Sequence, residues 1–248
     1  MSFLHLFPLF LAAVAAGGFN ALAGGGSIFT FPALIAAGVP PLVANVTNTV
    51  ALCPGYVGGV LAQRRDLAGQ GRRMAILLPV AAAGGLAGAL LLTRTSEKTF
   101  ESLVPPLVLA ACGLLAVQDR VRALLARRSA RIPLAWAIGP VFLAAIYGGY
   151  FGAGLSVVFL AMIGLAIDDN LTRLNGLKQA MALATNVAAA LFFAATARVV
   201  WPAAAVMAAG ALLGGAAGGR LANAVRPFTL RIVVIAVGIL LAAYFIVR

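Results

Sequence analysis

The sequence predicts an all-α polytopic membrane protein, and three observations support that fold class. Of the 248 residues, 63% are hydrophobic and only 10% are charged, whereas a soluble domain usually has about 25% charged residues. Residues 1–63 and 132–167 contain no Lys, Arg, Asp or Glu. The apolar residues form continuous blocks, and about 20 such residues cross a bilayer as a helix. A transmembrane β-barrel would show short alternating strands instead.

The formal net charge of +12 does not indicate a nucleic-acid binder. The Arg residues cluster between apolar blocks, where the preference of cytoplasmic loops for positive charge explains them. Cys53 and Cys112 lie in apolar segments, and their spacing predicts neither a metal site nor a disulfide framework. We therefore expect no nucleic-acid partner, no metal and no cofactor.

The polar residues do not predict an enzyme or a carboxylate proton relay. The chain has no HExxH or GxSxG motif and no paired aspartates within a membrane block. All six carboxylates lie outside the centres of the apolar blocks, whereas proton pumps commonly use buried Asp, Glu or His.

Charged or polar breaks divide the chain into ten apolar blocks. Two of them, residues 27–38 and 155–167, would rise only about 18–20 Å as helices, against a hydrocarbon core of about 30 Å. We therefore predict about eight full transmembrane helices and two short half-helices. No Lys or Arg precedes the first block, so we interpret it as a membrane helix rather than a signal peptide. The blocks are residues 3–23, 27–38, 43–62, 74–93, 102–118, 133–151, 155–167, 172–196, 201–219 and 228–247.

The order of the blocks is the same in two halves of the chain. Each half has a long block, a glycine-rich break, a short block, a helix with scattered polar residues, and two more helices. The pattern predicts a single membrane transporter domain over residues 1–248. It comprises a first repeat at about 1–118, a cytoplasmic Arg-rich linker at about 119–132 and a second repeat at about 133–248.

The distribution of positive charge favours inverted repeats. If each broken segment enters and leaves on the same side, four loops on one side hold 13 of the 18 Lys and Arg residues. If each broken segment spans the membrane, the split is only 11 to 6, so the inverted arrangement fits the positive-inside rule better. It places both termini on the non-cytoplasmic side of the cell membrane. The four loops are residues 63–73, 119–132, 168–173 and 220–231.

The glycine breaks predict an anion-binding cavity. A break within the membrane leaves backbone N–H and C=O groups that lipid cannot satisfy, so it must face protein or water. The helix that begins after the break points N–H groups and a partial positive charge at that space. Matched interrupted segments are typical of binding sites in secondary transporters; the alternative is that the glycines only permit close packing. The predicted donors are Gly24, Gly25, Gly26 and Ser27, with Gly152 and Gly154 in the second half.

The helix after each short block carries the side chains that we expect to orient the anion. Asn45, Thr49 and Cys53 are four residues apart and share a helix face. Lys178 lies well inside a predicted membrane helix, where a charge by default marks a functional site. The alternatives are that Lys178 snorkels to the interface and that the Asn and Thr residues only bond between helices. The predicted substrate-binding side chains are Asn45, Asn48, Thr49, Asn175, Lys178, Gln179 and Asn186.

Two stretches resemble the TauE/SafE family of sulfite and organosulfonate exporter-like membrane permeases. The first reads AGGFNALAGGGSIFTFPALIAAGVPPLVANVTNTVALCPGYVGG, and the second reads LNGLKQAMALATNVAAALFFAATARVVWPAAAVMAAGALLGGAAGGRLA. The resemblance covers nearly the whole chain and consists of soft patterns of Gly, Asn and Pro. It implies transport of a small sulfur-containing anion such as sulfite, a sulfonate or thiosulfate, and family members are often described as exporters.

These observations together predict a secondary transporter, working as an exporter, that moves a small sulfur-containing anion across the cell membrane by alternating access. A passive anion channel would show the same charge pattern. A non-transporting membrane assembly partner would not need a polar stripe that faces a glycine break. The sequence leaves open the anion, the direction, any coupling ion and the formation of a homo-oligomer.

Overall fold

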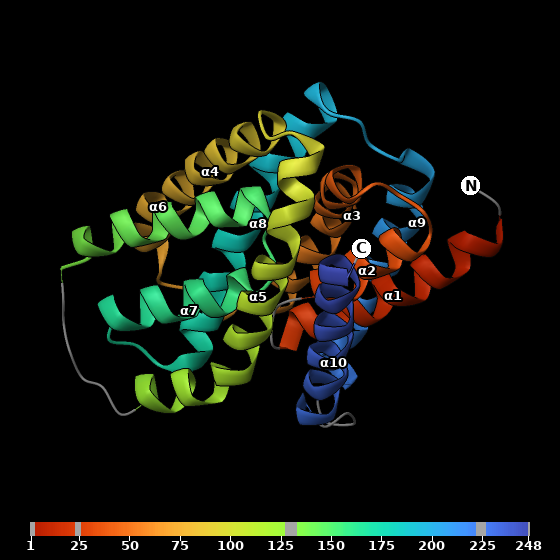
Figure 1. Ribbon diagram of the computed structural model, residues 1–248. Coiled ribbons are helices and arrows are strands. Elements are labelled where there is room, and N and C mark those ends of the chain that lie inside the picture. The colour runs from red at the N-terminus through yellow and green to blue at the C-terminus, as the bar shows by residue number, and fades with distance from the viewer. Residues whose placement is uncertain (1–2, 23–25, 127–132, 222–226, 248) are drawn as a thin grey trace.

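The computed structural model describes residues 3–22, 26–126, 133–221 and 227–247, and within these ranges it has ten helices and no strand. Each expected apolar block corresponds to one helix (Figure 1). The helices are α1 (Phe3–Leu22), α2 (Ser27–Ala36), α3 (Pro41–Ala62), α4 (Gly71–Thr93), α5 (Glu97–Ala126), α6 (Ala135–Tyr150), α7 (Leu155–Ala166), α8 (Leu171–Thr196), α9 (Trp201–Leu221) and α10 (Pro227–Val247).

The short helices have the expected lengths, but only part of the expected membrane spans is confirmed. The short helices α2 and α7 have 10 and 12 residues, as expected. Among the described residues only α4, the part Glu97–Val121 of α5, and α8 are long and apolar enough to cross a membrane. The helix α6 has 16 residues and rises about 24 Å. The expected number of about eight full spans is therefore not confirmed.

The helix α5 is longer than the sequence predicted. It begins at Glu97 and continues to Ala126, so the first part of the expected linker is helical rather than a loop. Val, Arg, Ala and Leu follow residue 119, and most of these residues have good helix propensity. The rest of the linker, residues 127–132, lies outside the described residues.

Two pairs of parallel helices form the sides of the molecule. In Figure 1, α4, α6 and α7 lie on the left, α1 and α9 lie on the right, and α5 and α10 run down the front. The helix α1 packs along α9, with Gly210 beside Phe10 and Gly214 beside Val14. In the same way α6 packs along α4, with Gly88 beside Ile146.

The helices α3 and α8 pack against each other in opposite directions. Asn175, near the start of α8, donates a hydrogen bond to the Gln63 side chain, which follows the end of α3. At the other end, the backbone N–H of Val200 donates to Thr47 near the start of α3. The helices α5 and α10 also pack together.

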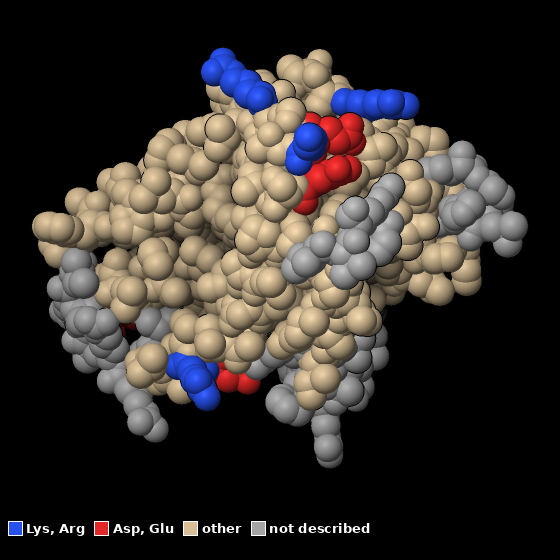
Figure 2. Space-filling model, viewed as in Figure 1, with Lys and Arg blue, Asp and Glu red and all other residues tan. Residues whose placement is uncertain are grey.

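The surface between the ends of the molecule is apolar. Figure 2 shows most Lys, Arg, Asp and Glu side chains near the upper and lower edges of one face, with a mostly uncharged area between them. Large apolar side chains such as Leu143, Leu191 and Leu213 are exposed on α6, α8 and α9. An apolar surface of this kind is suited to contact with lipid.

Glycine lets α4 and α6 approach closely, and this contact gives a stability prediction. A Cβ atom added at Gly149 would lie 2.0 Å from the backbone oxygen of Gly85, which cannot move without shifting α4. We expect Gly149→Ala to lower the melting temperature of the detergent-solubilised protein, at a cost of about 1–3 kcal/mol. Gly139→Ala on the same helix is the control, because nothing lies within 4 Å of its added Cβ. Equal melting temperatures of the two variants would contradict this packing.

Candidate functional site

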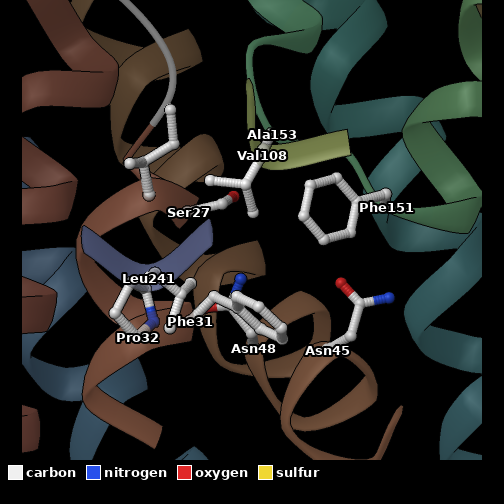
Figure 3. Close-up of a pocket in the computed structure, with 10 residues that line it drawn as sticks. Ser27, Phe31, Pro32, Asn45, Asn48, Val108, Phe151, Ala153 and Leu241 are labelled. Carbon is white, nitrogen blue, oxygen red and sulfur yellow. The ribbon is translucent and has the colours of Figure 1, made fainter. Parts of the chain in front are cut away.

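A small cavity lies where the start of α2 meets the polar face of α3. Its volume is about 10 Å³, which is close to the space that one water molecule needs. Figure 3 shows Ser27, Asn48 and Phe151 arranged around this space. Polar side chains from α2 and α3 therefore share one cavity with apolar side chains from α5, α10 and the α6–α7 connection. The lining residues are Ser27, Ile28, Phe31, Pro32, Asn45, Asn48, Val108, Phe151, Ala153 and Leu241.

The two asparagines of this cavity differ in their hydrogen bonds. The side-chain amide of Asn45 donates to the backbone oxygen of Tyr150 at the end of α6, at 2.8 Å. Asn48 is only 2% exposed, and its amide oxygen has no hydrogen-bond partner among the described residues. A buried polar atom without a partner is costly and calls for an explanation such as an absent ligand. This oxygen can only accept a hydrogen bond, so it does not itself bind an anion; the one donor of the Asn48 side chain is its amide nitrogen.

Two of the backbone N–H groups that we expected to face the anion are already used in hydrogen bonds within the protein. The N–H of Gly26 donates to the side chain of Asn20 at 2.7 Å, and the N–H of Gly152 donates to the oxygen of Tyr147. The N–H groups of Gly26 and Gly152 are therefore not free to bind an anion in this structure. Gly152 and Gly154 adopt φ values of +76° and +75°, so glycine is needed there for the sharp turn before α7. Gly24 and Gly25 lie outside the described residues.

A second polar cluster lies further along α3, towards its end, and includes two of the predicted residues. Gln179 donates to the backbone oxygen of Asn20 at 3.2 Å, and Tyr56 lies beside the side chains of Asn20 and Asn186. The amide nitrogen of Asn20 and the amide oxygen of Gln179 have no partner among the described residues. We call Asn20, Tyr56, Gln179 and Asn186 the Asn20 cluster. None of the four lines the cavity around Asn48.

The remaining predicted residues have separate environments. Lys178 is 1% exposed, so its side chain does not snorkel to the surface of the chain. Lys178 does not line the cavity. It occupies the same position in its helix as Asn48 does, because each is the eighth residue, Lys178 of α8 and Asn48 of α3. Asn175 bonds to Gln63 at the far end of α3, and Thr49 donates to the backbone of its own helix.

The sequence analysis did not identify four buried residues: three belong to the cavity around Asn48 or to the Asn20 cluster, and the fourth, Ser156, lies at the start of α7. They are Asn20, Tyr56, Phe151 and Ser156, each at most 5% exposed. For Asn20 and Ser156, the sequence contains a feature that could have identified them. Asn20 is the last polar residue before the first glycine break, and a serine follows both breaks, as Ser27 and as Ser156.

An ion-pair network joins the loop after α3 to the start of α8. Asp169 pairs with Arg73 of α4 and, at 3.1 Å, with Arg173 of α8. Arg173 also donates to the backbone oxygen of Ala68 at 3.0 Å, and Gln70 donates to the backbone oxygen of Arg173. Partial burial alone would raise the pKa of the Asp169 carboxyl, but hydrogen bonds from Arg73, Arg173 and the N–H of Asn170 hold this pKa below its usual range.

The lowered pKa of Asp169 gives a pH prediction. A carboxyl whose pKa is lower in the folded state adds stability above its unfolded pKa of about 3.9, and this stability is lost as the pH falls through the folded value. We expect Asp169→Asn to lower the melting temperature at neutral pH, at a cost of roughly 1 kcal/mol for a partly exposed pair. The difference from the unmodified protein should shrink below about pH 4. A difference that stays constant down to the acid limit would contradict this role of the charge.

Comparisons with known proteins found a family and relatives that match most of the chain. The sequence model of the family described as sulfite exporter TauE/SafE matches residues 9–245. The chain is 30% identical over 223 residues to the probable membrane transporter protein YfcA of Escherichia coli (strain K12), a match that covers 86% of this chain and 79% of the relative. No solved structure matches the chain.

Two further relatives carry similar names. A probable membrane transporter protein of Haemophilus influenzae is 28% identical over 221 residues, covering 86% of this chain and 83% of the relative. The probable membrane transporter protein ORF9 of a Sinorhizobium species is 26% identical over 234 residues, covering 94% of this chain and 89% of the relative. With a family match over almost its whole length and relatives named as membrane transporters, this chain belongs to the sulfite exporter TauE/SafE family.

Proposed function

We propose that the protein is a secondary transporter that exports a small sulfur-containing anion, such as sulfite, a sulfonate or thiosulfate, across the cell membrane by alternating access. The observation that carries this proposal is the small cavity at the start of a half-helix, where the buried side chains of Asn48 and Ser27 bring an amide nitrogen and a hydroxyl group together as possible hydrogen-bond donors. Amide N–H and hydroxyl groups can donate hydrogen bonds to an anion at this position. The family description supports the sulfur chemistry.

The small size of the cavity favours a carrier over an open channel. At about 10 Å³ it cannot hold an oxyanion unless the surrounding helices move apart. In a carrier, substrate enters by such a movement on one side of the membrane and leaves by the opposite movement on the other side. The network around Asp169 joins the two halves of the chain at one end of α3, and the contact between Asn45 and Tyr150 joins them nearer the other end. Each contact would have to break in one half of the cycle.

The packing of the helices supports two inverted repeats, α1–α5 and α6–α10. The pair α1 and α9 corresponds to the pair α6 and α4 when the two halves are exchanged, and both pairs are parallel. The corresponding helices α3 and α8 run in opposite directions, as an axis in the plane of the membrane requires. In this arrangement Lys178 on α8 is the counterpart of Asn48 on α3, and we propose that it supplies the charge that balances the anion. Both termini would lie on the non-cytoplasmic side.

The first experiment measures thermal stability of the purified protein with sulfite, thiosulfate, sulfoacetate, sulfate, phosphate and acetate. A ligand that binds only the folded state stabilises it by about RT ln(1 + [L]/Kd). We expect at least one sulfur-containing anion to raise the melting temperature and to show saturable flux in proteoliposomes. Flux that does not saturate, together with single-channel currents, would establish a channel instead. Stabilisation only by cations or neutral solutes would overturn the anion site.

A further inference from the structure

A second and larger cavity lies between the first turns of α4 and α6, away from the cavity around Asn48. Its volume is about 540 Å³, and it is lined by two arginines, Arg72 and Arg73, and by apolar residues that include Ile76, Leu134 and Ile138. Cavities of 300–1,000 Å³ commonly bind small ligands. The proposed transport mechanism does not use this cavity.

The two arginines of the cavity have different roles. Arg73 is held by Asp169 and by the side chain of Gln70. Arg72 is exposed and makes no ion pair or hydrogen bond with any residue in the described part of the chain. The cavity therefore has one guanidinium group that the protein itself does not neutralise, which favours an anionic ligand.

The walls of the cavity indicate that the ligand is also partly apolar. Ile76 on α4 and Ile138 on α6 line it, and Ile138 is partly exposed on the outer surface. Trp136, next to this wall, is 74% exposed. Exposed Trp side chains are enriched where a membrane protein meets the headgroup level of the bilayer. A guanidinium group above an apolar wall at that level matches a phospholipid, with its phosphate on the arginine and its acyl chain along the isoleucines.

We propose that this cavity binds one anionic glycerophospholipid, with Arg72 as the main contact of the headgroup. A soluble phosphate would use the arginine but would gain nothing from the apolar wall. A zwitterionic lipid would use the wall but would have a weaker electrostatic interaction with Arg72. The charge and the wall together thus select the anionic lipid.

The test uses the full-length protein, purified in detergent and delipidated, without any transport substrate. Phosphatidylglycerol and phosphatidylcholine with the same acyl chains are titrated while the melting temperature is recorded. We expect phosphatidylglycerol to give the larger stabilisation. We expect Arg72→Ala to raise the phosphatidylglycerol concentration for half-maximal stabilisation about fivefold, since one arginine near a membrane surface contributes about 1 kcal/mol. Arg72→Lys, which keeps the charge but not the planar fork, should lie between the two.

The control is Arg94→Ala, an exposed arginine that ends α4 at its opposite end. It should leave the response to phosphatidylglycerol unchanged. Equal stabilisation by the two lipids, or an equal loss in Arg72→Ala and Arg94→Ala, would overturn the proposal. Stabilisation by soluble glycerol 3-phosphate as large as that by phosphatidylglycerol would assign the cavity to a soluble phosphate and would overturn the lipid assignment.

Discussion

Replacing Lys178 by alanine is expected to abolish most of the stabilisation that a sulfur-containing anion gives to the folded protein. The side chain is 1% exposed, and an ion interacts more strongly with an anion in such a low-dielectric environment than it does in water. Truncating one member of a buried charge pair typically costs about 2–5 kcal/mol, so we expect the Kd for the anion to rise at least about 30-fold. Lys178→Arg should retain part of the affinity because it keeps the charge.

The measurement is the shift of the melting temperature against anion concentration for each variant. Lys98 is the only other lysine of the chain, and it is exposed near the start of α5, so Lys98→Ala is the matched control. This control should bind the anion as the unmodified protein does. An unchanged Kd in Lys178→Ala would remove Lys178 from the site and would leave Asn48 and Ser27 as its polar residues.

Asn48→Leu is expected to separate stability from transport. The amide oxygen of Asn48 is buried without a partner, so leucine, which has a similar volume, removes an unsatisfied polar group and should leave the melting temperature unchanged or raise it. The same change removes the amide nitrogen, which is the donor that we assign to the anion. We expect saturable anion flux in proteoliposomes to fall by more than about tenfold, as the loss of a hydrogen bond to a charged ligand of about 1.5–3 kcal/mol implies.

Asn45→Leu provides the contrast within the same cavity. Asn45 donates to the backbone oxygen of Tyr150, so its replacement leaves that oxygen without this donor and should lower the melting temperature. If Asn48→Leu were destabilising to the same degree and transported normally, Asn48 would be a structural residue and the cavity would not be the anion site.

Much of the fold was predictable because it depends on local properties of the chain. The ten apolar blocks correspond to ten helices, since an apolar segment bounded by polar or glycine-rich residues has few other ways to satisfy its backbone in a membrane. The half-helices α2 and α7 were likewise predictable, because glycine breaks and block length are visible in the sequence. The end of α5 was not, because a helix does not have to end where the apolar residues end.

The partition of the polar residues was decided by tertiary structure. The sequence placed Asn48, Gln179 and Asn186 in one site, but the structure places Asn48 beside Ser27 and the other two with Asn20 and Tyr56. Which face of α8 meets α3 depends on how closely helices approach at residues far apart in the chain. One example is Gly59, where an added Cβ would lie 2.6 Å from Gln179.

The amino-acid sequence by itself thus determined the class of protein, the order of the helices and the types of residue that could bind an anion, because hydropathy, charge and glycine content act locally. Only the tertiary structure decided which polar side chains share a cavity, that Lys178 is buried, and that Asp169 joins Arg73 to Arg173. These contacts join residues as much as 159 positions apart, as between Gln179 and Asn20, so they exist only when the helices are packed.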